Sequence, residues 1–460
     1  MAAERSTPGT AGGKLSRAAR GDGSRRRAGS SGTASRAGST KGAGTARRAG
    51  SSEGAGTAGR AAASRSAAAA PAGPVAQAIE RFNAGRDPER LALKYKALRA
   101  RAFGFFRGTG HLFCDDWRAR RSDAPEAAPI VFACGDLHWE NFGAFKGDNR
   151  LTYFDINDFD EACVAPATFD LARLVASVFV GSEELGIDAR QAAQLARQLV
   201  DAYAAALATG KPRWLERTLA EGAIGALLTG LQQRRRAAFL NSRTHLRGGR
   251  RRLIFDGIHE LPASDEQRAR AEALVRRFAE SQPRPELFKI RDIGRRIAGT
   301  SSLGLERYGV IVRGIGDPDG NLLLDVKLQP GSVPAGLFPQ MQHRWPCEGA
   351  RVVSMQRTMQ AISPAFLTAV DSFVVRELQP VEDRLSLRVL RGRPRRIEGV
   401  MHAMAAELAW DQLRSASRCG AASWDELTAF GARRDWRGPL IAYAREAARV
   451  SMRQWHQFRR

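Results

Sequence analysis

Helix-like and strand-like patterns alternate along this chain of 460 residues. In 77–120, apolar side chains recur at helical spacing, and 170–280 is rich in Leu, Ala and Arg and poor in Pro. The segments 348–370 and 396–458 have a similar helical pattern. We therefore expect helices over most of these four segments.

Short apolar runs bounded by turn-forming residues predict strands. One run spans 130–135 and ends in a glycine, a second spans 151–154, and a third spans 373–378. Two more runs, 310–312 and 322–326, flank the turn-forming sequence Gly-Asp-Pro-Asp-Gly and predict a hairpin. The combined pattern predicts an α+β fold.

Changes in composition divide the chain into four expected parts. We expect a tail over 1–75, a helical part with an acidic loop over 76–285, a sheet-containing part over 286–395, and helices over 396–460 that pack on the first helical part. The first 70 residues contain thirteen Lys and Arg, three Asp and Glu, and no aromatic residue. A segment without large apolar side chains does not offset the entropy of ordering its backbone, so we expect a disordered tail.

The net charge of +24 raises the question of an anionic partner. The basic tail is either a solubilising extension or an arm that binds nucleic acid or another polyanion weakly. It also superficially resembles a transit peptide, which we rank third. The arginine runs 234–236 and 250–252 and the basic end 459–460 fit solvated helix faces better than a nucleic-acid interface.

Hydropathy and cysteine usage favour a cytoplasmic protein. The longest apolar run, 174–180, is far shorter than the roughly 20 residues of a membrane span. The N-terminal region has no apolar core typical of a secretory signal, so we expect neither membrane association nor secretion. The five cysteines show no paired or metal-ligand spacing, which favours reduced thiols.

An acidic loop that follows the first predicted strand carries the most chemistry. The sequence 134–143, Cys-Gly-Asp-Leu-His-Trp-Glu-Asn-Phe-Gly, is followed by 154–162 and by Asp170-Leu-Ala. Within 154–162, four carboxylates fall in a span of seven residues. They repel one another unless a cation or a basic partner neutralises them. These four carboxylates belong to Asp155, Asp158, Asp160 and Glu161. Hard oxygen ligands of this kind suit Mg²⁺, whereas the structural alternative is a solvated loop with helix-capping Asp residues.

A second constellation lies downstream and has the features of a phosphate grip. Gly299, Ser301 and Gly304 form a small-residue turn between two predicted strands, where backbone N–H groups can approach phosphate oxygens. Lys327 on the next strand is the candidate phosphate-binding lysine, and Glu348, which opens a predicted helix, is its candidate ion-pair partner. The strand 373–378 would then be the hinge beside a bound adenine.

The sequence Gly-Asp-Leu-His-x-x-Asn resembles the catalytic loop of aminoglycoside- and choline-kinase-like enzymes. This resemblance implies that Asp136 orients or deprotonates an acceptor hydroxyl, that Asn141 binds Mg²⁺, and that Asp170 braces the loop. The distance to Asp170 favours Asp158 as the second metal ligand, and the distance from Asn141 favours Asp155. Since the phosphate grip follows the catalytic loop, the resemblance implies a circularly permuted, bilobal kinase-like fold.

The ordered chain also resembles the bacterial domain of unknown function 2252 family. The similar motifs include Phe-Gly-Phe-Phe-Arg-Gly at 103–108, the loop 134–143, and Glu-Gly-Ala-Arg-Val-Val at 348–353. The family resemblance implies kinase-like ancestry and identifies no acceptor. His138 in the loop is either a catalytic base or metal ligand, or a residue that supports the loop backbone, and the last role is favoured because no second His or Cys stands at ligand spacing.

Together these observations predict an ATP- and Mg²⁺-dependent transferase that phosphorylates a hydroxyl of a small molecule. The same acids also suit a nucleotidyl transferase. A third possibility is a non-catalytic, nucleotide-binding scaffold with a polyanion-binding tail. The sequence identifies neither the acceptor nor the oligomeric state.

Overall fold

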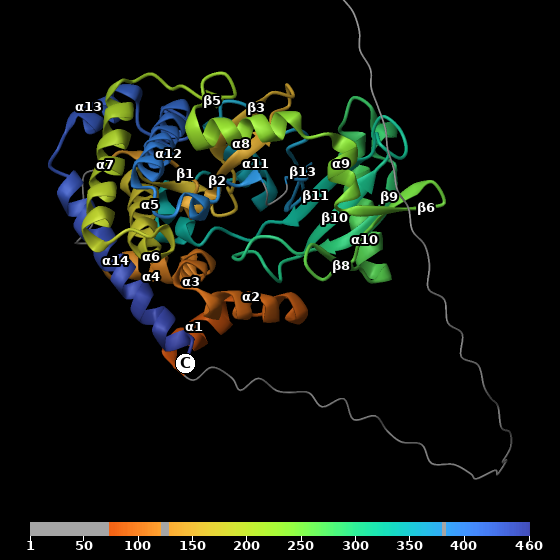
Figure 1. Cartoon of the computed structure of the whole chain (residues 1–460), viewed down its shortest axis with the longest axis horizontal. Helices are drawn as coiled ribbons and strands as arrows, with labels where there is room; N and C mark the ends of the chain where they lie inside the picture. The colour runs from red at the N-terminus through yellow and green to blue at the C-terminus, as the bar shows by residue number, and fades with distance from the viewer. Residues whose placement is uncertain (1–72, 121–127, 380–382) are drawn as a thin grey trace, which may run out of the picture. The chain divides into compact units, whose positions relative to one another are not determined.

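The computed structural model describes residues 73–120, 128–379 and 383–460, so the tail predicted over 1–75 lies outside the described residues apart from its last three positions. The described chain begins with short helices that are joined by tight turns (Figure 1). These helices are α1 (Pro74–Phe82), α2 (Pro88–Ala100), α3 (Ala102–Gly108) and α4 (Gly110–Ala119). Helix α2 begins at Pro88 because the Asp87 side chain accepts hydrogen bonds from the first free N–H groups.

Two small antiparallel sheets follow and carry the acidic loop. Strand β1 (Ile130–Ala133) pairs with β4 (Cys163–Pro166). Strand β2 (Phe142–Lys146) pairs with β3 (Thr152–Ile156), which also pairs with β5 (Leu215–Glu216). The strands predicted at 130–135 and 151–154 are therefore confirmed, and the loop between β1 and β2 is held at both ends by paired strands.

Long helices enclose these two sheets and form the larger hydrophobic core. Helix α5 (Thr168–Val180) is buried along nearly its whole length and packs against α14 (Arg437–Phe458), while α7 (Ala189–Ala208) packs against α12 (Pro394–Arg414) and α13 (Trp424–Ala432) (Figure 1). The smaller helices of this part are α6 (Ser182–Leu185) and α8 (Gly222–Gln233), whereas Leu240 of α9 (Arg236–Asn241) packs with Ile311 and Leu323 in a separate cluster. The helices predicted over 396–458 are confirmed.

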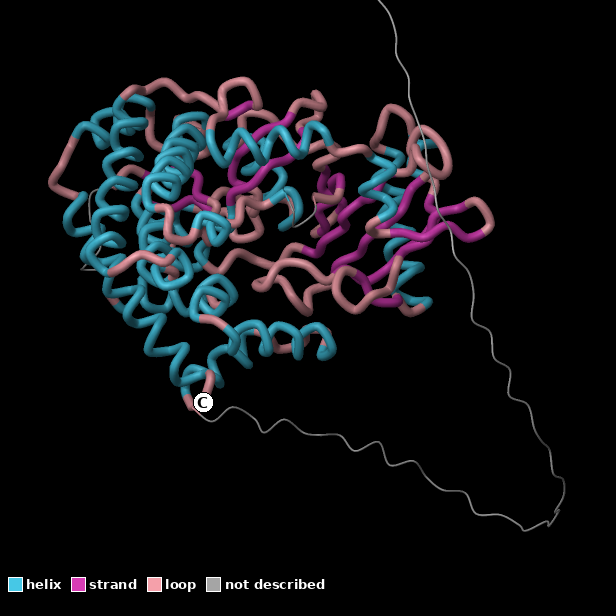
Figure 2. The backbone as a smooth tube through the Cα atoms, viewed as in Figure 1, coloured by secondary structure: helices cyan, strands magenta, loops and turns pink. Residues whose placement is uncertain are grey.

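A six-stranded antiparallel sheet forms the second part (Figure 2). Its spatial order is β12 (Thr368–Val370), β13 (Phe373–Glu377), β11 (Leu322–Leu328), β10 (Arg307–Val312), β9 (Ile290–Arg296) and β8 (Glu260–Pro262). Helix α10 (Asp265–Glu280) packs on this sheet, and Phe278, Val310 and Val326 belong to the hydrophobic core that results. Helix α11 (Glu348–Met359) packs against β12 and β13. The predicted hairpin and the strand at 373–378 are confirmed.

The prediction of continuous helix over 170–280 is wrong between α9 and α10. Strands β6 (Thr244–Arg247) and β7 (Arg250–Leu253) form a hairpin there, and its two central residues, Gly248 and Gly249, both have positive φ. A two-residue turn of this kind favours glycine at both positions. Strand β8 belongs to the six-stranded sheet and α10 contributes to its core, although both precede residue 286, where we expected the sheet-containing part to begin.

The α+β class is thus confirmed. Among the residues that the structure describes, no helix is long and apolar enough to cross a bilayer, and all five cysteines are free thiols. Short 3₁₀ helices complete the described chain at Trp139–Asn141, Pro285–Phe288, Pro334–Leu337, Pro339–Met341 and Leu387–Leu390.

Candidate functional site

The acidic loop begins with a turn that a buried carboxylate holds in place. Gly135 has φ of +83°, and its N–H and that of Cys134 donate to the Asp170 carboxylate at 3.0 and 2.7 Å. Burial raises the pKa of Asp170 to about 6, and the two N–H donors act in the opposite direction. Asp170 lies in the first turn of α5, so the helix and the loop are joined at this point.

Asp136 follows the turn, and its carboxylate forms an ion pair with Arg173, one turn further along α5. Arg173 is itself fixed, since it donates to the carbonyl of Phe106 at 3.0 Å and lies over the Phe106 ring. Burial raises the pKa of Asp136 to about 6, the charge of Arg173 opposes this, and the negative charge of Asp158 adds to it. Gly110 approaches so closely that a Cβ there would lie 2.9 Å from the Asp136 Oδ1 atom.

Asn141 connects the loop to the segment that carries Asp158. Its side-chain amide donates to the Asp136 carbonyl at 2.7 Å, and its own carbonyl accepts the N–H of Asn157 at 2.7 Å. Asp158 is the next residue, and its charge acts on Asp136. The structure therefore brings Asp136, Asn141 and Asp158 together.

Asp155 belongs to a different cluster of carboxylates. Successive side chains of a strand point to opposite faces, and Asp155 on β3 lies with Glu407 and Asp411 of α12. One carboxylate oxygen of each residue lies within 4.8 Å of the others, and all three residues are buried. Arg414 occupies the same place, with Nη2 at 3.6 Å from Asp155 Oδ2 and 3.7 Å from Glu407 Oε2. By geometry these carboxylates could hold a cation, and Arg414 already supplies one positive charge to them.

The Asp155 cluster gives a prediction for stability. Both Glu407 carboxylate oxygens are buried without a hydrogen bond, and burial and the Asp155 charge raise the Glu407 pKa far above its usual range. The folded state therefore binds a proton that the unfolded state releases above about pH 4.5, so this group lowers stability as pH rises. We expect Glu407→Gln to stabilise the protein by about 1–3 kcal/mol at pH 8 and by less at pH 5, measured by urea denaturation.

The exposed substitution Glu272→Gln serves as the control and should change stability equally at both pH values. A Glu407→Gln variant that is destabilised at pH 8, together with a wild-type protein that EDTA destabilises, would contradict the prediction and favour a bound divalent cation.

Lys327 reaches the acidic segment from the sheet. Its ammonium on β11 forms an ion pair with Asp160, and the charges of Lys327 and Arg307 lower the pKa of that carboxyl. The expected pair between Lys327 and Glu348 is not formed, because Glu348 pairs at 2.6 Å with Arg351 on the same helix. Arg351 donates in turn to the Asp160 carbonyl at 2.8 Å, so Glu348 contacts the acidic segment only indirectly.

Arginines that the sequence analysis did not identify surround the same acids. Arg307 on β10 is held by Asp325, with Nε to Oδ1 at 2.7 Å, and the charges of Asp158 and Asp160 also act on it. The backbone of Arg384 forms a β-bridge with Gly143, and its side chain forms no hydrogen bond or ion pair with any residue that the structure describes. Burial and the neighbouring arginines lower its pKa to about 10, while Asp158 opposes this. A partly buried guanidinium without an ion-pair partner favours a bound anion. Because a carboxylate lies nearby, an anion that carries its own metal cation would suit this place.

The small-residue turn lies between β9 and β10, as predicted, with Gly299 and Gly304 at φ of +71° and +88°. Its carbonyls face cations, since Ser301 accepts from Arg86 at 2.7 Å and from Lys94 at 2.9 Å. The N–H groups of the turn residues 300–302 donate to no acceptor among the described residues. They are therefore available to an anion.

Lys94 connects the turn to the acidic loop. Its side chain is fully buried and contacts no carboxylate. Burial lowers the pKa of Lys94 well below the usual range, and the charge of Asp136 opposes this effect. The turn also meets the junction of α3 and α4, where Thr300 Cγ2 lies 3.0 Å from the position of a Cβ on Gly108. The motif at 103–108 contains Gly108 of this contact, whereas no local pattern identified Lys94 or Arg384.

His138 is buried inside the loop. It is 2% exposed and packs edge-on against Phe103, with ring centroids 5.8 Å apart. Burial and the nearby arginines lower its pKa well below the usual range, which keeps the imidazole neutral.

Fold and site define an α+β protein in which an acidic loop, braced by a buried helix, meets a sheet that carries lysine and arginine. Residues 86–460 match the bacterial family described as uncharacterized protein conserved in bacteria (DUF2252), and the chain belongs to this family. No curated protein and no solved structure matches the chain.

Proposed function

We propose that this protein is an ATP- and Mg²⁺-dependent, kinase-like transferase that moves a phosphoryl group to a hydroxyl of a small molecule. The observation that carries this proposal is the meeting of Asp136, Asn141 and Asp158 with Lys327 and the unpaired Arg384. Carboxylate and amide oxygens next to cations suit a metal-bound phosphate chain.

Asn141 and Asp158 supply oxygen ligands of the type that Mg²⁺ prefers, so the residues fit the metal. The metal, when bound, would neutralise and orient the phosphate oxygens. Lys327 and Arg384 would bind those oxygens, and the free N–H groups of residues 300–302 would add neutral donors.

Asp136 is the candidate base. Arg173 fixes the orientation of its carboxylate, and the amide of Asn141 holds its backbone carbonyl. A pKa of about 6 leaves the carboxylate ionised at neutral pH and basic enough to accept the proton of the acceptor hydroxyl while its oxygen bonds to the transferred phosphorus and ADP leaves.

The order of the elements supports a permuted kinase-like architecture as part of the proposal. The small-residue turn, the Lys327 strand, helix α11 and strand β13 follow one another as in the nucleotide-binding lobe of a kinase. Here they come after the acidic loop in the sequence, and such a permutation is compatible with a surface position of chain ends.

Calorimetric titration of ATP, with and without Mg²⁺, tests the proposal. We expect Mg²⁺-dependent binding to the wild-type chain, and affinity about tenfold or more weaker for Lys327→Met and for Arg384→Met, because each removes a charged hydrogen bond. Asp158→Asn should abolish the gain from Mg²⁺.

Lys289→Met provides the control, since Lys289 is exposed and lies outside the site. Titrations at 0.15 M salt and above separate this binding from nonspecific attraction to the basic N-terminal residues. Absence of binding to the folded wild-type chain would reject a nucleotide-dependent transferase. Binding without transfer to any acceptor would favour the scaffold, and transfer of AMP would favour the nucleotidyl transferase.

A further inference from the structure

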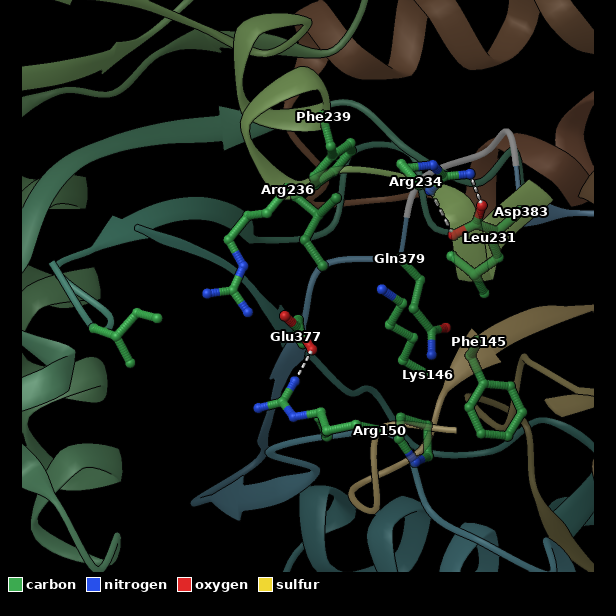
Figure 3. Close-up of a pocket in the computed structure, with 14 residues that line it drawn as sticks. Phe145, Lys146, Arg150, Leu231, Arg234, Arg236, Phe239, Glu377, Gln379 and Asp383 are labelled. Atoms are coloured by element: carbon green, nitrogen blue, oxygen red, sulfur yellow. Dashed lines mark hydrogen bonds and ion pairs between the residues drawn. The ribbon is translucent and has the colours of Figure 1, made fainter. Parts of the chain in front are cut away.

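A second pocket of about 510 Å³ is lined by none of the side chains proposed to bind the metal or the phosphates or to accept the proton, although Glu377 and Leu378 in its wall belong to the strand expected beside the adenine. The turn of the β2–β3 hairpin, the end of β13 and the connection between α8 and α9 form its walls (Figure 3). This volume is typical of pockets that bind small molecules.

Part of the wall is apolar. Phe145 of β2, Phe239 of α9 and Leu231 of α8 contribute side chains to it, together with Ile315 and Leu378. Ile315 is 76% exposed, which is unusual for a large aliphatic side chain and leaves apolar surface available at this pocket. Such a wall suits a ring or another apolar group of a ligand.

Two of the four cations in the pocket are neutralised. Arg150 pairs with Glu377 at 3.0 Å, and Arg234 donates to Asp383 at 3.0 Å (Figure 3). These pairs fix the side chains and remove their net charge from the pocket.

The other two cations, Lys146 and Arg236, are unneutralised. Neither side chain forms a hydrogen bond or an ion pair with any described residue, and Lys146 is partly buried. Figure 3 shows that they extend toward the pocket from different elements, and that Gln379 lies beside Lys146. Two positive charges beside an apolar wall therefore have no counterpart within the described chain.

We propose that this pocket binds a phosphate monoester with an apolar or aromatic ring. A phosphate monoester carries close to two negative charges at neutral pH, which matches the two unneutralised cations. The ring would contact Phe145 and Phe239, and the phosphate oxygens would accept from Lys146, Arg236 and the Gln379 amide. The proposal is independent of the function proposed for the acidic loop.

Calorimetric titration of 1-naphthyl phosphate into the full chain tests this proposal. We expect binding that is about tenfold weaker for Lys146→Met and for Arg236→Met, because each variant loses one charged hydrogen bond. The exposed substitutions Lys211→Met and Arg235→Met are matched controls outside the pocket and should leave the affinity unchanged. Inorganic phosphate and 1-naphthol should each bind at least about tenfold more weakly than the ester.

The site of binding is decided by one more variant, Lys327→Met. Naphthyl phosphate affinity that falls in this variant, and stays unchanged in Lys146→Met and Arg236→Met, would assign the anion to the acidic loop and overturn the proposal. Absence of binding to the wild type, or inorganic phosphate that binds as tightly as the ester, would overturn it as well. Because Arg236 is exposed, its substitution tests the pocket even if the Lys146 variant were poorly folded.

Discussion

Asp136→Asn is expected to reduce phosphoryl transfer by about a thousandfold, since the amide cannot accept the proton of an acceptor hydroxyl. The affinity for ATP with Mg²⁺ should change little, because the neighbouring Asn141 and Asp158 are retained. The measurement follows the transfer of label from γ-labelled ATP to the small-molecule fraction of a bacterial extract. A parallel calorimetric titration gives the nucleotide affinity of the same variant.

The pH dependence of the wild-type rate provides a second readout of the same residue. The pKa of Asp136 is about 6, and only the ionised carboxylate accepts a proton. The rate should therefore fall as the pH drops below about 6 and level off above it. Asp148→Asn, which changes an exposed turn aspartate, is the control and should keep the wild-type rate and pH profile. Wild-type transfer by Asp136→Asn would exclude Asp136 as the base.

The sequence indicated those parts of the site that are close together along the chain. The acidic loop, the bracing Asp170 and the segment of Asp158 lie within 40 residues, and paired strands on both sides of the loop bring them together. The apolar runs that predicted these strands were short and clearly bounded, which is why the fold class could be predicted correctly.

The choice between Asp155 and Asp158 shows how strand periodicity could have helped further. Phe154 and Ile156 are buried apolar neighbours of Asp155 on β3, and they point to the opposite face of the sheet. The Asp155 side chain therefore points to the other face of the sheet, toward α12. Its partners there lie some 250 residues further along the chain, and no local pattern predicted that contact.

The pairing of two further side chains, Lys94 and Glu348, could not be predicted from local sequence patterns. Lys94 lies in an ordinary helical pattern, and its role depends on the packing of α2 against a turn 207 residues away. Glu348 was expected to pair with Lys327, but Arg351 stands three residues later on the same helix and competes successfully for it. Side-chain pairs between distant elements depend on packing that periodicity does not describe.

Gly135→Ala is expected to destabilise the protein by about 4 kcal/mol or more, because two costs combine at this residue. A Cβ at Gly135 would lie 1.9 Å from the Glu161 carbonyl oxygen, and the φ of +83° is unfavourable for alanine. The backbone would have to shift, which would weaken the hydrogen bond from Gly135 to Asp170 and displace the acidic segment. Urea denaturation monitored by tryptophan fluorescence measures the free energy of unfolding.

Gly420→Ala separates the two costs of this prediction. Gly420 has a nearly identical φ of +84°, and no atom lies within 4 Å of its Cβ position, so only the backbone strain of about 1–2 kcal/mol remains. The excess cost of Gly135→Ala over Gly420→Ala then measures how tightly the acidic loop packs on the Glu161 segment. That packing also positions Asp160 and its ion pair with Lys327, so the two variants should differ in nucleotide affinity as well as in stability. Equal costs for both variants would mean that the loop is not held against this segment, and the proposed meeting of acids and cations would lose its structural basis.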